Sequence, residues 1–354
     1  MIRLGYTNCA ACHVAPQGGG LLNDYGRGID QAQSLRGGEY EPADDGLFRS
    51  ISANGRIRQD LRFVMQQQTR WNGQAASTAM RGRVLYRAVA ALSSNLRFAG
   101  TVTGENESAA RPSLSYEPPA TPSHVFVNTA LLHYRAGNAL EIAVGRDQLP
   151  AGINIPDLGV FIKSRNRLGY YDAPAQIKAV WAGDRFQVMP FVYGSAGNEI
   201  RGERERGAGS LAEFDVLGNH RTVLGATIQH SSAGNGDRRL TGGYARVGFG
   251  KWGILAEHDI TNRFRGTTSQ AFRQDASYAQ VFWAARDWLV TSATGERLRV
   301  DAPFREHLTA GKVEIATRFT SHATLTLGTR VEHNAATGRI ATSLAVQFAL
   351  KTVD

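Results

Sequence analysis

The two cysteines of the chain, Cys9 and Cys12, are separated by two residues and are followed directly by His13. This is the C-x-x-C-H spacing, in which two thiols bond the vinyl groups of one haem and the adjacent imidazole ligates its iron. A zinc site would need further ligands, and the chain has no second cysteine pair. A thioredoxin-like dithiol would need a βαβ context, which is absent around the motif. We therefore predict one covalent haem c, bonded by Cys9 and Cys12 and ligated by His13.

A second iron ligand is not evident beside the motif, because neither His nor Met occurs between His13 and the first predicted strand. The sixth position of the iron is then open, or its ligand comes from the rest of the chain or from a partner. Met189 is one candidate, since it occupies an inward position of a predicted strand and thioether ligation raises haem potential. A methionine that simply fills the lumen is the alternative. His133 is the second candidate, because it lies near a short predicted turn, on a strand of ambiguous parity.

From about Arg56 onward, apolar and polar residues alternate with the period of a β-strand. The last segment is typical: Ile340, Leu344 and Phe348 share one face, and Ser343 lies on the other. The chain contains about sixteen such segments of roughly ten residues, the length that a tilted strand needs to cross a membrane. The connections between them alternate between short and long, as in outer-membrane barrels, where periplasmic turns are short and outer loops are longer.

These patterns predict an all-β fold: a transmembrane antiparallel β-barrel of about 16 strands with a short N-terminal c-type haem-binding segment. We assign residues 1–50 to the haem segment and residues 51–354 to the barrel. An even strand number places both termini on the periplasmic side of the bacterial outer membrane. The first eight residues lack the apolar core of a signal peptide, so an exported chain would start at a mature N-terminus or have a mis-assigned start.

The composition is consistent with this assignment. Hydrophobic residues make up 42% of the chain and charged residues 20%, which excludes a disordered chain. No apolar run is long enough for a membrane-spanning helix. The formal net charge is +9, but the arginines are spread along the whole chain, and nucleic-acid binding requires a basic patch. We therefore expect outer-membrane lipid and no nucleic acid among the partners.

The longest predicted connection, 148–174, follows the fifth strand. It resembles the constriction loop of sixteen-stranded general porins, which folds into the lumen; a solvated outer loop is the alternative. The charged residues that such a lumenal loop would carry are Asp157, Lys163, Arg165, Arg167 and Asp172.

A short haem-binding segment joined to a barrel resembles the outer-membrane fused monohaem cytochrome c–porin family of iron-oxidising bacteria. The resemblance rests on C-A-A-C-H at 9–13 with Pro16, on the following L-N-D-Y-G-R at 22–27, and on the barrel architecture. It implies electron transfer across the outer membrane, from extracellular Fe(II) to a periplasmic c-type cytochrome or another electron carrier. It also implies one covalent haem c at Cys9 and Cys12, with His13 as the iron ligand.

Two other functions remain open from the sequence. The barrel could be the sleeve of a porin–cytochrome conduit that holds a multihaem cytochrome, with the single haem as a relay. It could also be a solute porin whose haem is structural. A haem enzyme such as a peroxidase is the least favoured function, because no distal acid–base constellation is evident. Whether Fe(II) oxidation makes the chain an enzyme is left open.

Overall fold

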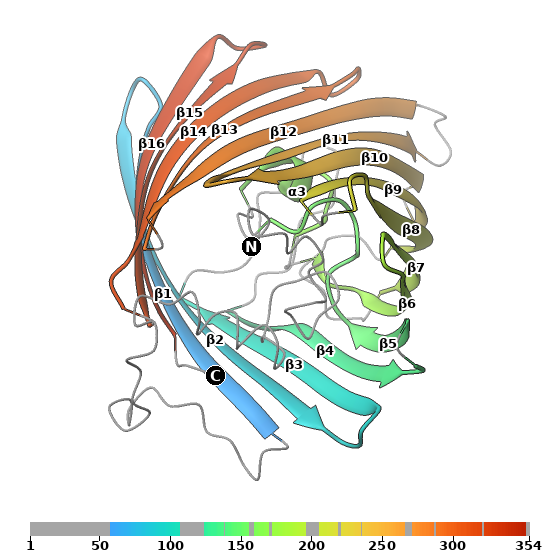
Figure 1. Ribbon diagram of the computed structural model, residues 1–354. Helices are drawn as coiled ribbons and strands as arrows, with labels where there is room; N and C mark the ends of the chain where they lie inside the picture. The colour runs from blue at the N-terminus through green and yellow to red at the C-terminus, as the bar shows by residue number, and fades with distance from the viewer. Residues whose placement is uncertain are drawn as a thin grey trace.

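A computed structural model describes residues 57–106, 124–137, 139–155, 159–169, 172–195, 205–218, 221–234, 236–265, 271–286, 288–320 and 322–351. The haem motif at 9–13 and Asp157 lie outside the described residues. The described residues form sixteen strands that close into one antiparallel barrel, in which each strand pairs with its sequence neighbours and the first pairs with the last (Figure 1). The predicted barrel is confirmed.

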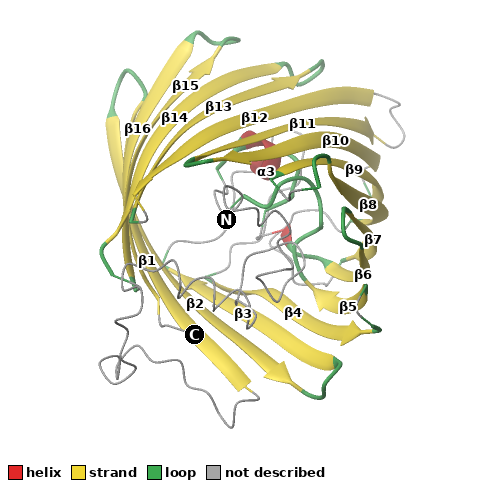
Figure 2. Ribbon diagram, in the orientation of Figure 1, coloured by secondary structure: helices red, strands yellow, loops and turns green. Residues whose placement is uncertain are grey.

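The strands follow one another along the chain without a crossover. Their bounds are β1 (Ile57–Trp71), β2 (Ala76–Ala91), β3 (Leu96–Glu105), β4 (Val125–Arg135), β5 (Leu140–Arg146), β6 (Ala175–Ala182), β7 (Phe186–Gly194), β8 (Arg206–Asp215), β9 (Thr222–Ala233), β10 (Gly236–Phe249), β11 (Trp252–Arg265), β12 (Ala271–Arg286), β13 (Leu289–Val300), β14 (Glu306–Arg318), β15 (Ala323–Asn334) and β16 (Arg339–Lys351). A four-residue helix, α3 (Phe161–Ser164), lies inside the barrel (Figure 2).

The alternation predicted from the sequence determines which way each side chain points. On β16, the side chains of Ile340, Leu344 and Phe348 are 56%, 48% and 39% exposed on the outer face, whereas Ser343 is buried inside. So large an apolar outer surface would be unfavourable in water, and it matches the lipid-facing band of membrane barrels. Among the described residues, no helix combines the length and the apolar character needed to cross a membrane.

The two ends of the barrel differ in their connections. We call "turn end" the end that carries the connections 92–95, 136–139, 183–185, 216–221, 250–251, 287–288 and 319–322. The other end is the loop end. Because β1 starts at Ile57 and β16 finishes at Lys351, the antiparallel order places both of these residues at the turn end. The segment that precedes residue 57 therefore joins the barrel at the turn end.

The predicted connections near 70–80 and 232–239 are shorter than expected. The strands continue to 71 and 233, which leaves the connections 72–75 and 234–235. Backbone pairing between antiparallel neighbours needs no apolar side chains, so strands can extend past the residues whose alternation is visible in the sequence.

The inner face of the barrel is covered unevenly. Most inward side chains of β9 to β13 are buried, whereas most of those on β15, β16, β1 and β2 are only half-buried. On β11, Glu257, Asp259 and Thr261 are at most 3% exposed. The cover over these strands comes from the connection between β5 and β6, which carries α3 and lies within the barrel (Figure 2).

Candidate functional site

The connection between β5 and β6, here called the lumenal loop (147–174), enters the barrel and bonds to its inner wall. The Gly152 amide donates to Thr227 Oγ1 of β9 at 2.9 Å, and the Ile153 amide donates to Glu257 Oε2 of β11 at 2.7 Å. The Phe161 amide, at the start of α3, donates to Glu296 Oε2 of β13 at 2.7 Å. Irregular backbone away from water needs such acceptors for its N–H groups. The inward oxygens of three strands thus hold the loop in place.

Asn166 fixes the middle of the lumenal loop. Its side chain is fully buried and donates from Nδ2 to Asp259 Oδ2 at 2.8 Å. Its Oδ1 accepts from Thr261 Oγ1 at 2.9 Å and from Gln274 Nε2 at 2.7 Å. Every polar atom of this amide group therefore has a partner on β11 or β12, so this part of the loop has one defined position on the wall.

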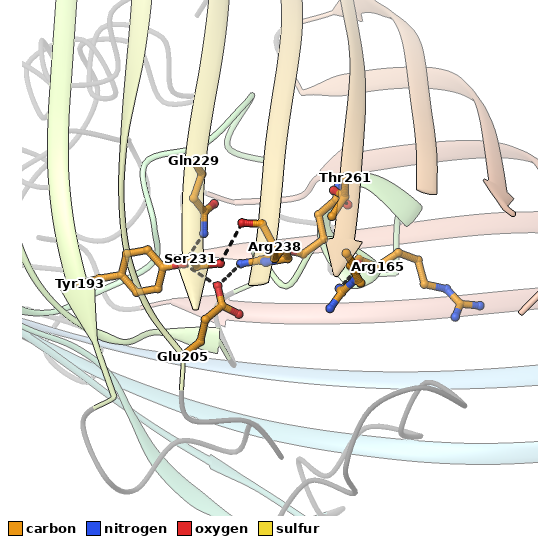
Figure 3. A network of polar contacts seen from close by, with 9 residues as sticks. Arg165, Tyr193, Glu205, Gln229, Ser231, Arg238 and Thr261 are labelled. Atoms are coloured by element: carbon orange, nitrogen blue, oxygen red, sulfur yellow. Dashed lines mark hydrogen bonds and ion pairs between the residues drawn. The ribbon is translucent and has the colours of Figure 1, made fainter. Parts of the chain in front are cut away.

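A buried ion pair secures the same segment from β10. Arg238 donates from Nη1 to the Asn166 carbonyl at 2.5 Å and from Nη2 to Glu205 Oε1 at 2.5 Å. Tyr193 donates its hydroxyl hydrogen to the same Glu205 oxygen at 2.5 Å, and Gln229 Nε2 donates to the Tyr193 hydroxyl (Figure 3). Arg238 and Glu205 are each 4% exposed. Removal of either partner would leave an uncompensated charge in a buried site.

The predicted charged residues of the loop are occupied by local contacts. Lys163 is 3% exposed and donates to the Ala151 carbonyl at 2.9 Å, with Glu257 Oε1 at 3.9 Å. Arg165 pairs with Glu306 at 2.8 Å. Arg167, at φ +55°, and Asp172 are buried. Lys163 therefore bonds the loop to itself and Arg165 bonds it to the start of β14, while burial limits the charge that Arg167 and Asp172 present to a passing ion. Sequence reasoning did not identify their wall partners.

Met189 lies inward on β7, as predicted, but its surroundings differ from the predicted polar lumen. It is 3% exposed and belongs to an apolar cluster that contains Val160 and Phe161 of the lumenal loop and Leu211 of β8. The loop brings apolar side chains over this part of the wall, which accounts for an inward methionine without an iron. A cavity of about 30 Å³ beside it, between loop and wall, has room for about one water molecule.

His133 lies inward on β4, near the turn end, and is 1% exposed. Its Nδ1 lies 2.8 Å from Glu141 Oε1, and the other oxygen of Glu141 accepts from Arg97 Nη2 at 2.7 Å. Its Nε2 is buried and has no hydrogen-bond partner in the described part of the chain. The parity of this strand is ambiguous in the sequence because the β3–β4 pairing shifts register between Thr101 and Val102, where β4 has one extra residue, Asn128.

The wall around His133 carries both charged and small apolar side chains. Arg97 of β3 pairs directly with His133, and Glu141 of β5 bonds it. Four inward side chains on β2 to β5 are small or aliphatic and are at most 7% exposed. We call them the turn-end patch: Val89, Ala99, Leu131 and Ala143. A haem has a flat apolar face and an iron that takes an imidazole nitrogen, so the patch and the unpartnered Nε2 fit that group. Among the described residues, no group of three or more His, Cys, Asp or Glu is arranged to hold a bare metal ion.

The fold and the loop define the class of this molecule: a closed, antiparallel sixteen-stranded β-barrel of the outer-membrane type, with one connection folded into its lumen. No family model and no curated protein matches the sequence. Solved structures of outer-membrane proteins match the fold. Outer-membrane-expressed OmpT of Vibrio cholerae is similar with a TM-score of 0.61 and 11% identity, over 86% of this chain and 100% of that one.

Two further solved structures are similar over comparable lengths. OprB of Pseudomonas putida at high pH has a TM-score of 0.61 and 7% identity, over 84% of this chain and 94% of that one. An anion-selective porin from Comamonas acidovorans has a TM-score of 0.59 and 10% identity, over 83% of this chain and 99% of that one. At these identities the likeness establishes a shared fold.

Proposed function

We propose that this chain is an outer-membrane monohaem cytochrome c–porin fusion that passes electrons across the outer membrane, from extracellular Fe(II) to a periplasmic carrier such as a c-type cytochrome. The observation that carries the proposal is the C-x-x-C-H motif, which contains both cysteines of the chain and precedes a barrel of the outer-membrane type. The motif lies in the segment that joins the barrel at the turn end. Short connections face the periplasm in such barrels, so the haem is proposed on the periplasmic side.

The chain would hold the haem by thioether bonds from Cys9 and Cys12 and by His13 on the iron. When bound, the group supplies one-electron transfer: Fe(II) outside loses one electron to become Fe(III), and the periplasmic carrier is reduced by the same electron. The barrel would separate the haem and its donor from lipid and would give the donor a route toward the haem. Its apolar band is about 25 Å tall, so one haem at one end needs a donor that enters the lumen. The half-buried inner face of β15, β16, β1 and β2, which is the other side of the barrel from the strands that hold the loop, would line that entry.

The first test is the absorbance spectrum of the detergent-solubilised protein, produced with its own export and haem-attachment machinery and then mixed with Fe(II). We expect c-type bands that change to the reduced form on mixing. The double variant Cys9→Ala/Cys12→Ala should form the same barrel and carry no covalent haem. A wild-type protein without covalent haem would overturn the proposal. Covalent haem that Fe(II) leaves oxidised would leave a haem protein but remove iron as its donor.

A solute porin with a structural haem is the second candidate, because the loop covers one side of the lumen and leaves the inward side chains of the other side half-buried. It predicts steady solute conductance in a planar bilayer, equal for oxidised and reduced protein. The sleeve for a multihaem cytochrome is less favoured, since the lumenal loop already occupies part of the lumen on the side of β9 to β13.

A further inference from the structure

We propose that His133 is the second protein ligand of the haem iron, on the side opposite His13, and that Glu141 positions its imidazole. This inference rests on the proposed haem c and adds to it a ligand from the barrel wall. Three properties of His133 support it: the state of its ring nitrogens, its place relative to the end of the haem segment, and the small apolar side chains of the turn-end patch.

The hydrogen-bond pattern leaves Nε2 ready to bind a metal. A carboxylate only accepts hydrogen bonds, so Nδ1 carries the hydrogen in the 2.8 Å contact with Glu141. Nε2 then carries a lone pair, is buried, and has no partner in the described part of the chain. Histidines that ligate metals usually donate their other N–H to a carboxylate, which fixes the ring and raises its basicity. Arg97, bonded to the other Glu141 oxygen at 2.7 Å, holds that carboxylate in turn.

The strand register places His133 near the point where the haem segment joins the barrel. Ile57 pairs with Ala90, Ala90 pairs with Phe98, and Phe98 pairs with Leu132, the residue before His133. At roughly 4.8 Å between neighbouring strands, three steps correspond to about 14 Å along the wall. An extended chain spans roughly 3.3 Å per residue, so the residues between His13 and Ile57 cover this distance many times over. The segment between His13 and Ile57 is therefore long enough for the haem iron to reach Nε2 of His133.

The wall near His133 offers a haem small apolar side chains next to the charged groups of Arg97 and Glu141. Leu131 and Ala143 are fully buried, and Val89 and Ala99 are 4% and 7% exposed. Lumen walls of water-filled barrels are polar, so the buried apolar side chains and the imidazole nitrogen without a described partner favour a group that is apolar and carries a metal. The group we assign is the haem of this chain's N-terminal segment.

Met189, the other ligand candidate, is less suitable by the same criteria. Its side chain is 3% exposed and lines the small cavity between loop and wall together with Leu149 and Ile153 of the lumenal loop. For its sulfur to reach an iron, that part of the loop would have to leave the wall, where the Ile153 amide bonds Glu257 at 2.7 Å. The side-chain bond that holds His133 comes from Glu141 of β5 and not from the lumenal loop.

The test compares haem ligation in full-length protein from the same expression system: wild type, His133→Ala, His133→Met, Met189→Leu and, as a matched control, His258→Ala. His258 lies exposed on the outer face, bonded to Ser277. Covalent haem is measured first, by the pyridine haemochrome assay. Ligation is then measured from the spin state in the absorbance spectrum and from near-infrared magnetic circular dichroism, which distinguishes two histidines from histidine and methionine.

We expect low-spin, bis-histidine haem in wild type, Met189→Leu and His258→Ala. His133→Ala should retain covalent haem, lose the low-spin bands, and recover them when imidazole is added. His133→Met should show a histidine–methionine signal and a higher potential. Glu141→Gln should remain low-spin with a raised potential, because a less basic imidazole stabilises the ferric iron less.

Unchanged low-spin bands in His133→Ala would overturn the assignment of the ligand and leave the haem itself intact. A change in Met189→Leu alone would transfer the role to that methionine. Absence of covalent haem from the wild type would instead overturn the proposed function, and this inference with it. Heat-modifiable migration on gels, measured for every variant, shows whether the barrel has formed.

Discussion

The buried pair of Arg238 and Glu205 gives the sharpest test of how the lumenal loop is held. The side chains of Arg238 and Glu205 are 4% and 2% exposed, and Arg238 Nη2 lies 2.5 Å from Glu205 Oε1. Loss of one partner of a buried pair costs about 3–5 kcal/mol, because the other charge stays buried, whereas apolar replacement of both is often close to neutral. We therefore expect Arg238→Met and Glu205→Leu each to lower the free energy of unfolding by about 3–5 kcal/mol.

The double variant Arg238→Met/Glu205→Leu should cost less than either single variant alone. What it still loses is the bond from Arg238 Nη1 to the Asn166 carbonyl and the acceptor of the Tyr193 hydroxyl, at roughly 1 kcal/mol each. The expected total of about 2 kcal/mol implies a coupling energy of about 4 kcal/mol or more between the two sites.

The measurement is urea unfolding of the refolded barrel in lipid vesicles, followed by tryptophan fluorescence and analysed as a double-mutant cycle. The matched control is the exposed pair of Arg299 and Asp301, whose side chains are 52% and 40% exposed at 3.1 Å. There Asp301→Ala should cost about 0–1 kcal/mol. Two results would refute the assignment of Arg238 and Glu205 as a buried anchor of the loop. One is a double variant whose loss of unfolding free energy equals the sum of the two single losses. The other is single variants that lose no more unfolding free energy than the Asp301→Ala control.

Two further substitutions test the position of the loop. Gly152→Ala should displace the loop and raise conductance in a planar bilayer, because Gly152 has φ +61° and an added Cβ would lie 1.7 Å from Glu257 Oε1. The control is Gly295→Ala, where an added Cβ meets nothing within 4 Å, and it should leave conductance unchanged. Asn166→Ala should lower the free energy of unfolding by about 3 kcal/mol, since it removes three buried side-chain hydrogen bonds. Asn72→Ala, in an exposed turn, should lower it by about 1 kcal/mol, because water replaces the amide there. Equal costs for the two variants would contradict this account of the loop.

The sequence by itself determined the barrel, because its signals are local. Alternation such as that of Ile340, Leu344 and Phe348 against Ser343 specifies both a strand and the face that it turns outward. The lengths and order of the connections then predicted the antiparallel order and an even strand number. The C-x-x-C-H motif at 9–13 is local as well. It lies outside the described residues, so the haem remains a proposal.

The arrangement inside the lumen was decided only by the tertiary structure. The Ile153 amide and its acceptor Glu257 are 104 residues apart, and the Phe161 amide and Glu296 are 135 apart. Neither pairing has a sequence pattern, because it depends on where the lumenal loop turns once it is inside the closed barrel. The same loop converted the predicted polar surroundings of Met189 into an apolar cluster.

His133 shows most clearly what cannot be predicted from the sequence alone. Strand parity has a period of two residues, so the extra residue that β4 carries at Asn128, between the partners of Thr101 and Val102, changes the parity along β4 and hides the direction of His133 in the sequence. Only the paired strands show that it points inward, with Glu141 on one ring nitrogen and the other nitrogen buried without a described partner. The sequence determined the chemistry available to an imidazole, and the closed barrel determined the direction in which that imidazole is offered, because a strand's register is set by its neighbours.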